Sequence, residues 1–125
     1  MAVPSVGPVQ GKCWGTTQSL FELNGVEVNR LITLNAGFSS EHIHNQKWSR
    51  FFVVSGKLRV IIFREDLVKD VTILTSGMCT DVPPRVWHKF EAVENSDVIE
   101  IYWVILEKSD IERRTIGGRR EDETN

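Results

Sequence analysis

The most informative stretch for the fold is HIHNQKWSRFFVVSGKLRVIIF, residues 42–63. It contains two runs rich in Val, Ile and Phe, Trp48–Ser55 and Leu58–Phe63, with the turn residues Ser55-Gly56 between them. Such runs are typical of β-strands, and no apolar stripe at helical spacing competes with them. The stretch therefore predicts two consecutive strands joined by a turn.

The same pattern continues on both sides, from Trp14 to Leu106. Short β-type runs recur at intervals of roughly 8–12 residues, which is typical of an antiparallel sandwich or barrel. Asn24-Gly25 is the strongest hairpin signal, because both central residues of a type I′ turn need a positive φ. The other expected strands are Thr16–Leu23, Val26–Leu34, His42–Asn45, Val68–Leu74, Cys79–Val82, Trp87–Ala92 and Val98–Leu106.

The two ends of the chain differ from this middle part. Residues 1–12 contain two prolines and two glycines, which predicts an extended N-terminal arm. Residues 13–107 are expected to form one β domain, since 125 residues suit a single domain. Residues 108–125 are highly charged, and we expect a partly disordered C-terminal tail with one helical turn near Asp110–Arg114.

Composition excludes several classes of protein. The net charge of −2 gives no field that would recruit nucleic acid or an anionic membrane. The longest apolar run, Ile101–Leu106, is far shorter than the ~20 residues of a membrane span. The first residues do not resemble a secretory signal, and two cysteines give no disulfide framework. We therefore expect a cytoplasmic protein with no nucleic-acid or membrane partner.

The chain has three histidines, and their positions predict a metal site. His42 and His44 are two residues apart, so on a strand both side chains point to the same face, whereas Ile43 points away. His88 lies in another β-type run. If that run closes the same barrel, three neutral imidazoles meet on one side of a cavity and could bind one divalent ion of Zn, Mn, Fe, Co or Ni. A histidine in a strand is more often a surface or hydrogen-bonded residue, so the pair alone does not establish the site.

With these histidines in place, the sequence resembles the cupin superfamily. All three histidines fall on the metal-ligand positions of the two cupin motifs. The resemblance implies an all-β fold, the cupin double-stranded β-helix or jelly-roll barrel, with one bound divalent metal. The residues that carry it are Gly37, His42-Ile43-His44, Ser49 and Gly56 in the first motif, and Gly77, Pro83-Pro84-Arg85, His88 and Ala92 in the second.

The chain also departs from these motifs. Ser49 stands where cupins place a glutamate ligand, so the resemblance does not imply a site of three histidines and one carboxylate. Arg85 replaces a glycine, Ala92 replaces an asparagine, and the spacing from Gly37 to His42 is one residue short. The fold and the metal are expected to survive these changes, but no specific reaction follows from the motifs.

Within the superfamily, the chain looks most like the cupin domain of type II mannose-6-phosphate isomerases. The stretches that carry this likeness are Trp14-Gly15 with Leu20-Phe21-Glu22, Trp48–Gly56, and Asp110–Arg113 with Gly118-Arg119. The resemblance implies isomerisation of a sugar or sugar phosphate. Two rival functions stay open: a non-haem iron dioxygenase with three histidine ligands, and a cupin that binds metal or sugar without turnover.

Three further residues are candidates for binding a small-molecule substrate. Ser49 is expected to point inward, where it could hold a water or a substrate hydroxyl, or serve as a small filler. Arg85 lies in a proline-tightened turn before His88 and could meet a phosphate or carboxylate. Arg119 matches the Gly-Arg ending of the isomerase-like group and could fold over the pocket. The sequence indicates no catalytic base, because strand alternation points Glu41 and Glu91 outward.

The tryptophans predict an interface. Trp48 and Trp87 each flank the candidate ligands with outward orientation, and we expect them on adjacent strands. Two outward tryptophans on adjacent strands would favour a contact between subunits. The sequence therefore predicts a homodimer.

Overall fold

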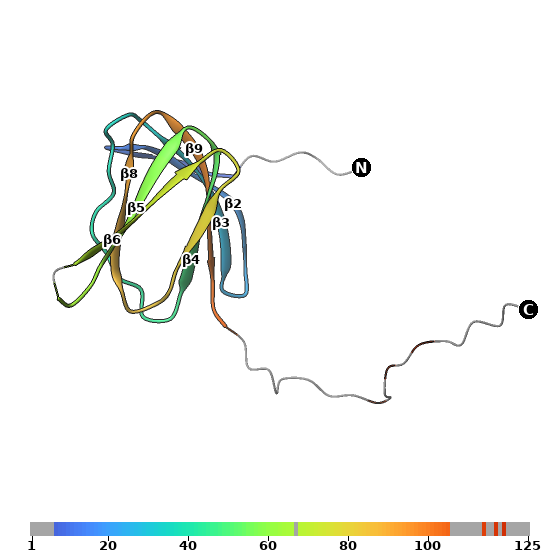
Figure 1. Cartoon of the computed structure of the whole chain (residues 1–125). Helices are drawn as coiled ribbons and strands as arrows, with labels where there is room; N and C mark the ends of the chain where they lie inside the picture. The colour runs from blue at the N-terminus through green and yellow to red at the C-terminus, as the bar shows by residue number, and fades with distance from the viewer. Residues whose placement is uncertain (1–6, 67, 106–113, 115–116, 118, 120–125) are drawn as a thin grey trace, which may run out of the picture.

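The computed structural model describes residues 7–66, 68–105, 114, 117 and 119. In these residues the chain forms nine strands and no helix (Figure 1). Within the same residues, no helix is long and apolar enough to cross a membrane. The strands are β1 (Val9–Lys12), β2 (Gly15–Leu23), β3 (Val26–Thr33), β4 (Trp48–Ser55), β5 (Lys57–Phe63), β6 (Lys69–Thr75), β7 (Cys79–Val82), β8 (Trp87–Ala92) and β9 (Ser96–Trp103).

The strands form two antiparallel sheets, as expected for a cupin jelly roll. The larger sheet has the order β1-β2-β3-β9-β4-β7, and the smaller one has the order β6-β5-β8. Residues 36–44 run antiparallel beside β8 and extend the smaller sheet through bridges at Phe38–Glu91 and His42–His88. This segment and β8 carry all three histidines of the chain.

Turn chemistry explains why the strands reverse where they do. Asn24 and Gly25, which join β2 to β3, have φ values of 51° and 80°, so the expected hairpin is confirmed. Gly56, between β4 and β5, has φ 97°, and a Cβ there would lie 2.3 Å from the carbonyl oxygen of Asn95. Only glycine fits such a crossing of two chain segments.

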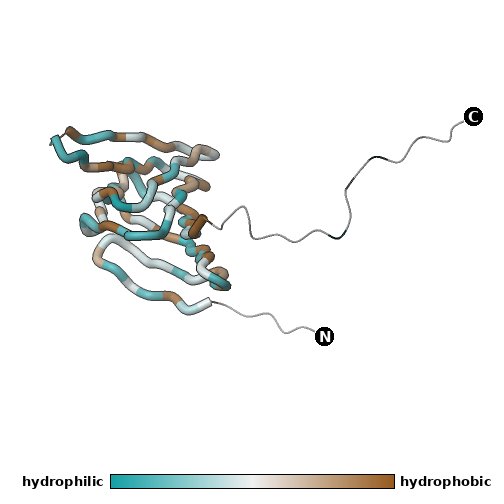
Figure 2. The backbone as a smooth tube through the Cα atoms, turned by 90° about the horizontal axis from the view of Figure 1, so that it is seen from below, coloured by the Kyte–Doolittle hydropathy of each residue, from teal (hydrophilic) through white to brown (hydrophobic). Residues whose placement is uncertain are grey.

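The apolar core lies between the two sheets. Along β4, buried side chains alternate with less buried ones, and apolar and polar residues are interspersed along the backbone tube (Figure 2). Burial of these side chains from water is the main force that holds the sheets together. The larger sheet contributes Leu31, Phe51, Val53, Val82 and Val98 to the core, and the smaller sheet contributes Leu58, Val60, Leu74 and Phe90.

The inner face of the larger sheet becomes polar toward one end. Strand register shows the change in three steps along β3, β9 and β4, because residues paired across strands share a face. The first layer is Leu31, Val98 and Val53; the second is Asn29, Glu100 and Phe51; the third is Glu27, Tyr102 and Ser49. The polar end is therefore built from the same strands that form the core.

Some local expectations differ from the structure. Residues 42–45 form an extended segment with one bridge at His42 rather than a strand, because their backbone pairs with β8 only at alternate points. Residues 9–12 of the expected arm form β1 and pair with β2. Strand β9 is Ser96–Trp103, two residues earlier at its start than expected. The expected helical turn at Asp110–Arg114 and most of the tail lie outside the described residues.

Candidate metal centre

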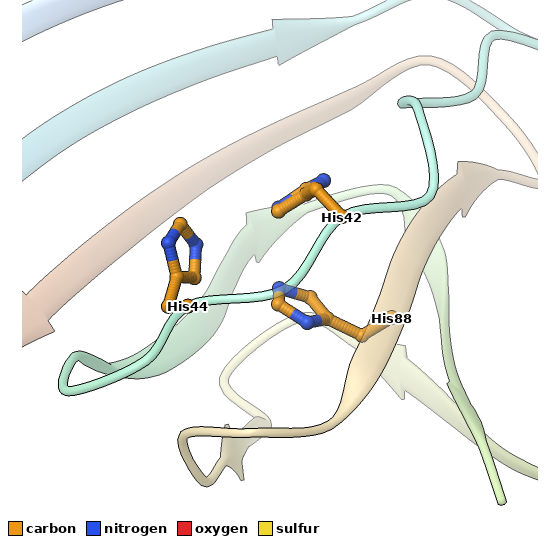
Figure 3. Close-up of side chains that lie close together, drawn as sticks. All are labelled: His42, His44 and His88. Carbon is orange, nitrogen blue, oxygen red and sulfur yellow. The ribbon is translucent and has the colours of Figure 1, made fainter. Parts of the chain in front are cut away.

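The structure brings the three histidines together on the inner side of the smaller sheet (Figure 3). His42 and His88 face each other across the sheet and exchange two backbone hydrogen bonds of 3.0 Å. Because they are cross-strand partners, His42 and His88 place their side chains on the same face of the sheet. His44 lies two residues after His42 in an extended segment, so its side chain is on that face too. One ring nitrogen from each histidine lies within 4.8 Å of the others.

Backbone carbonyls hold two of the rings. Nδ1 of His42 lies 2.9 Å from the carbonyl oxygen of Ser40, and Nδ1 of His88 lies 3.1 Å from that of Val86. A carbonyl only accepts, so each Nδ1 carries a proton, and in a neutral ring of this tautomer Nε2 has the free lone pair. Metal-binding histidines usually donate their second nitrogen in this way, which fixes the tautomer and the ring orientation.

Burial leaves part of this group without a partner. Among the described residues, Nε2 of His44 and Nε2 of His88 are buried and accept or donate no hydrogen bond. His88 is almost fully buried, at 1% exposure. A buried polar atom without a partner costs about 1–3 kcal/mol. Since zinc lies about 2.0–2.1 Å from a histidine nitrogen, a divalent ion between the rings fits this donor set after small ring movements.

The protonation of the rings suits a metal as well. Burial lowers the pKa of His44, and the neighbouring His42 and Lys47 lower it further. Burial also lowers the pKa of His88, to about 4. Both rings are therefore neutral at pH 7, and a neutral imidazole is the form that binds metal.

Ser49 lies inside the barrel next to this group. Its side chain is fully buried, and its hydroxyl oxygen has no hydrogen-bond partner among the described residues. Ser49 pairs with Tyr102 across β4 and β9, and the Tyr102 ring packs edge-on against His44 at a centroid distance of 5.2 Å. The hydroxyl is thus a third unpartnered polar group in the neighbourhood of the histidines.

A pocket of about 520 Å³ opens beside His42. Its lining includes two residues that the sequence motifs did not indicate, Glu100 and Tyr102, together with His42 and Asn29. Strand alternation could have found them, because Val98, Glu100 and Tyr102 have the same parity in β9 and Val98 is a core residue. The sequence signal that could have indicated this pocket is Glu100, a charged residue within an otherwise apolar strand.

Burial shifts the acidity of both residues. It raises the pKa of Glu100 to about 7, although the Tyr102 hydroxyl and the Asn29 amide donate hydrogen bonds to the carboxylate and oppose the shift. Burial also raises the pKa of Tyr102, and the neighbouring Glu100 adds to this effect. Glu100 is a carboxyl group that can change its protonation near neutral pH.

The match to a protein family shows what kind of protein this is. The cupin domain model matches residues 30–105, which include all three histidines, Ser49 and Glu100. The chain is a cupin. No curated protein matches it by sequence.

Solved structures with the same fold support this result. A tryptophan-to-tyrosine variant of oxalate decarboxylase from Bacillus subtilis matches with a TM-score of 0.70 at 12% identity, over 83% of this chain and 30% of that chain. KdgF from Halomonas sp. matches at 0.66 and 18% identity, over 76% and 85% of the two chains. An RmlC-like cupin from Shewanella frigidimarina matches at 0.66 and 20% identity, over 83% and 87%. This cupin thus spans under a third of the oxalate decarboxylase chain.

The two arginines expected at the substrate site lie elsewhere or make no described contact with it. Arg85 is exposed and lines a different groove, with Ile43 and Trp87, on the outer side of the smaller sheet. It lies in the turn before β8, where strand alternation does not hold, and it is not among the residues that line the pocket at His42. Arg119 is exposed, and the residues on either side of it lie outside the described part of the chain.

The outward residues are also placed by the structure. Glu91 points away from the pocket and forms ion pairs with Arg59 and Lys89, as alternation predicts. Trp48 and Trp87 are not on adjacent strands, which corrects that expectation: β4 belongs to the larger sheet and β8 to the smaller one. Trp48 instead stacks on Trp103, with ring centroids 6.1 Å apart.

Proposed function

We propose that this cupin binds one divalent metal ion through His42, His44 and His88 and acts on a small, oxygen-rich substrate. The observation that carries the proposal is the convergence of three imidazole rings, two of which, those of His44 and His88, have a buried Nε2 with no partner among the described residues. Buried polar atoms without a partner destabilise a protein unless an ion, a water molecule or a ligand supplies the missing interaction. One matching structure concerns the Mn(II) centres of Bacillus subtilis oxalate decarboxylase, which makes a metal a natural occupant of the fold.

The ligand set favours polarisation of substrate oxygens. When bound, the ion would supply a nearly uncompensated positive charge, because all three ligands are neutral and Ser49 replaces a carboxylate. The reaction that we propose is aldose–ketose isomerisation of a sugar or sugar phosphate. It requires a substrate held by two adjacent oxygens and a proton transfer between two carbons.

The pocket lining supports a polyhydroxylated substrate. Asn29 and Tyr102 line the pocket, and Ser49 adds a buried hydroxyl near the histidines. Lys12 is the cationic side chain among the lining residues, so the pocket has one group that suits a phosphate or carboxylate. The outer position of Arg85 makes a strong anion site in this pocket less favourable than a site for sugar hydroxyls.

Metal analysis of protein purified without added metal tests the first half of the proposal. We expect about one equivalent of a divalent ion, identified by elemental mass spectrometry, and its loss after treatment with a chelator. A coupled assay on mannose 6-phosphate, with mannose in parallel, then tests the reaction. Absence of bound metal, and of any metal uptake at micromolar concentration, would contradict the metal site itself.

The same neutral ligand set supports a second candidate, a non-haem iron dioxygenase. The observation that favours it is Ser49, because iron held by three histidines keeps positions open for O2 and a chelating substrate. Bound iron with O2 uptake would support this candidate over the isomerase. Bound metal with neither turnover nor O2 uptake would instead support a cupin that only binds metal or sugar.

A further inference from the structure

We propose that Glu100 is the acid–base residue of this site, and that it moves a proton on an α-hydroxy carbonyl substrate held beside the three histidines. The inference rests on the metal-dependent reaction proposed above and adds the base that reaction needs. The other carboxylates near the motifs point elsewhere: Glu41 lines the outer groove and Glu91 pairs with surface cations. Glu100 would be a catalytic residue in the strict sense, since it lines the pocket that we propose for the substrate.

The position of Glu100 follows from strand register. It pairs with Phe51 on β4 and with Asn29 on β3, and Phe51 is fully buried in the core. Residues paired in this way share a face, so Glu100 points into the barrel. It is only 6% exposed, yet it lines the same pocket as His42. A carboxylate in such a position is costly to maintain, which indicates a function.

Tyr102 connects Glu100 to the histidines. Its hydroxyl donates a hydrogen bond to the Glu100 carboxylate, and its ring packs against His44. Tyr102 therefore acts as a positioning residue, and Asn29 supports the carboxylate from the neighbouring strand.

The surroundings distinguish Glu100 from its nearest acidic neighbour. Glu27 lies at the rim of the barrel and forms an ion pair with Lys47 at 3.1 Å. Glu100 has no ion pair among the described residues, and burial makes its proton affinity much higher than that of an ordinary carboxyl. The charged or titratable groups that face it are Glu27 and Lys47 beyond Tyr102, Tyr102 itself, and across the pocket Lys12, Cys13 and His42.

The proton transfer balances without a further reactant. The Glu100 carboxylate takes the proton from the carbon next to the carbonyl: a C–H bond breaks, an O–H bond forms, the C–H electron pair becomes the carbon–carbon double bond of an enediolate, and the carbonyl π pair moves onto the carbonyl oxygen. Glu100 then returns the proton to the neighbouring carbon while the hydroxyl hydrogen passes between the two oxygens. The aldose and ketose are isomers, so nothing is oxidised or reduced overall. A carboxyl with a pKa of about 7 can both accept and release this proton at neutral pH.

The test compares three variants of the full chain. Glu100→Gln removes the proton-accepting group with little change in shape, and Glu100→Asp keeps a carboxyl group at a shorter reach. Asp97→Asn is the matched control, because Asp97 lies on the same strand but pairs with Arg30 on the outer surface. Each protein is loaded with zinc or manganese and incubated in D2O with mannose, fructose and mannose 6-phosphate, and deuterium incorporation is measured by mass spectrometry.

We expect Glu100→Gln to bind metal like the wild type but to exchange deuterium roughly 100-fold more slowly. Glu100→Asp should retain part of the exchange, and Asp97→Asn all of it. An independent readout is the metal-free protein labelled with 13C at the glutamate side-chain carboxyl. One resonance should titrate near pH 7 in the wild type and in Asp97→Asn, and be absent in Glu100→Gln.

The outcomes separate this inference from the proposed function. Exchange that persists in Glu100→Gln, loss of metal from that variant, or no carboxyl titrating near pH 7 would overturn the role of Glu100 alone. A metal-loaded wild type that exchanges none of the three probes would overturn the proposed isomerisation and this role with it. If Glu100→Gln fails to fold, unimpaired exchange in Glu100→Asp at all pH values would also argue against Glu100.

Discussion

At the scale of single residues, three buried polar groups decide what this cupin can do. His88, Ser49 and Glu100 are each at most 6% exposed, and two of them carry buried atoms without a hydrogen-bond partner among the described residues. Such groups lower stability in the absence of a ligand. Their concentration in one end of the barrel indicates that this end is shaped for binding rather than for stability.

His44→Ala tests the metal ligands. We expect the variant to lose the bound metal while it keeps the β fold, because the core layers do not include His44. The melting temperature of the metal-free protein should change little. Elemental analysis and circular dichroism check this, and Ile43→Ala, on the opposite side of the same segment, should retain the metal. A fully loaded His44→Ala protein would argue against a three-histidine site.

The stability of the metal-free protein should depend on the protonation of His88. Burial lowers the pKa of His88 to about 4 in the folded state, compared with 6.5 in the unfolded chain. The unfolded state therefore binds more protons between these values, and unfolding becomes easier as the pH falls from 6.5 to 4. The loss is of the order of 3 kcal/mol. Urea unfolding at pH 7 and pH 4.5 measures it, and the loss should be smaller in His88→Gln.

At the scale of elements, the segment 36–44 and strand β8 form the frame of the site. They carry all three histidines. Backbone hydrogen bonds join them along their length, from Ala36 N–H and the Ala92 carbonyl at one end to Arg85 N–H and the His44 carbonyl at the other. The segment ends near a turn in which Arg85 has a φ of 66°, a left-handed conformation that suits glycine. The cupin motif has a glycine at this position, and the positive φ explains that preference. The arginine of this chain adopts the same conformation at a cost in stability.

Arg85→Gly should relieve that cost. Because a side chain disfavours positive φ, we expect a gain of about 0.5–1 kcal/mol in the free energy of unfolding, partly offset by the greater freedom of glycine in the unfolded chain. Metal content should not change, since Arg85 lines the outer groove and not the pocket. Thermal unfolding monitored by tryptophan fluorescence measures the gain. A clear loss of stability would show that the arginine side chain makes a favourable contact.

At the scale of the whole molecule, stability and site are coupled by the barrel itself. The apolar layers hold the two sheets together, and the polar layers at one end place groups from both sheets around the pocket.

A homodimer and a cytoplasmic location stay predictions of the sequence. Exposed apolar residues such as Val71, Ile73 and Trp87 lie on the outside of the smaller sheet, and size-exclusion chromatography with light scattering would test for the dimer.

Metal should stabilise the whole fold. A ligand that binds only the folded state adds about 2.7 kcal/mol at a concentration 100 times its dissociation constant. For a domain of this size, that corresponds to a rise in melting temperature of roughly 5–15 °C. Scanning calorimetry with and without zinc or manganese measures the shift. The shift should vanish in His44→Ala, and an equal shift in that variant would point to a second binding site.

Much of this molecule can be predicted from residue patterns, and the failures have specific causes. The Val, Ile and Phe runs placed most strands, and Asn24-Gly25 placed a hairpin, because strand alternation and turn geometry are local properties. The same alternation placed His42 and His44 on one face. Arg85 was expected at the pocket because it lies in a proline-tightened turn three residues before His88, and closeness in sequence to a ligand does not fix the direction of a side chain in a turn. Glu100 was missed because it lies outside the cupin motifs. The sequence signal for it is that it lies two residues after the core residue Val98 in the same strand, so that both side chains point inward.

The order of residues is enough to establish the all-β class, the turns and the three histidines, since each depends on neighbours a few residues apart. The folded structure was needed to show that β8 lies beside residues 36–44, that Glu100 and Tyr102 share a pocket with His42, and that Arg85 faces outward. These facts depend on which strands pair and in what register. Pairing between distant segments is set by the packing of the whole core, which no short stretch of sequence contains.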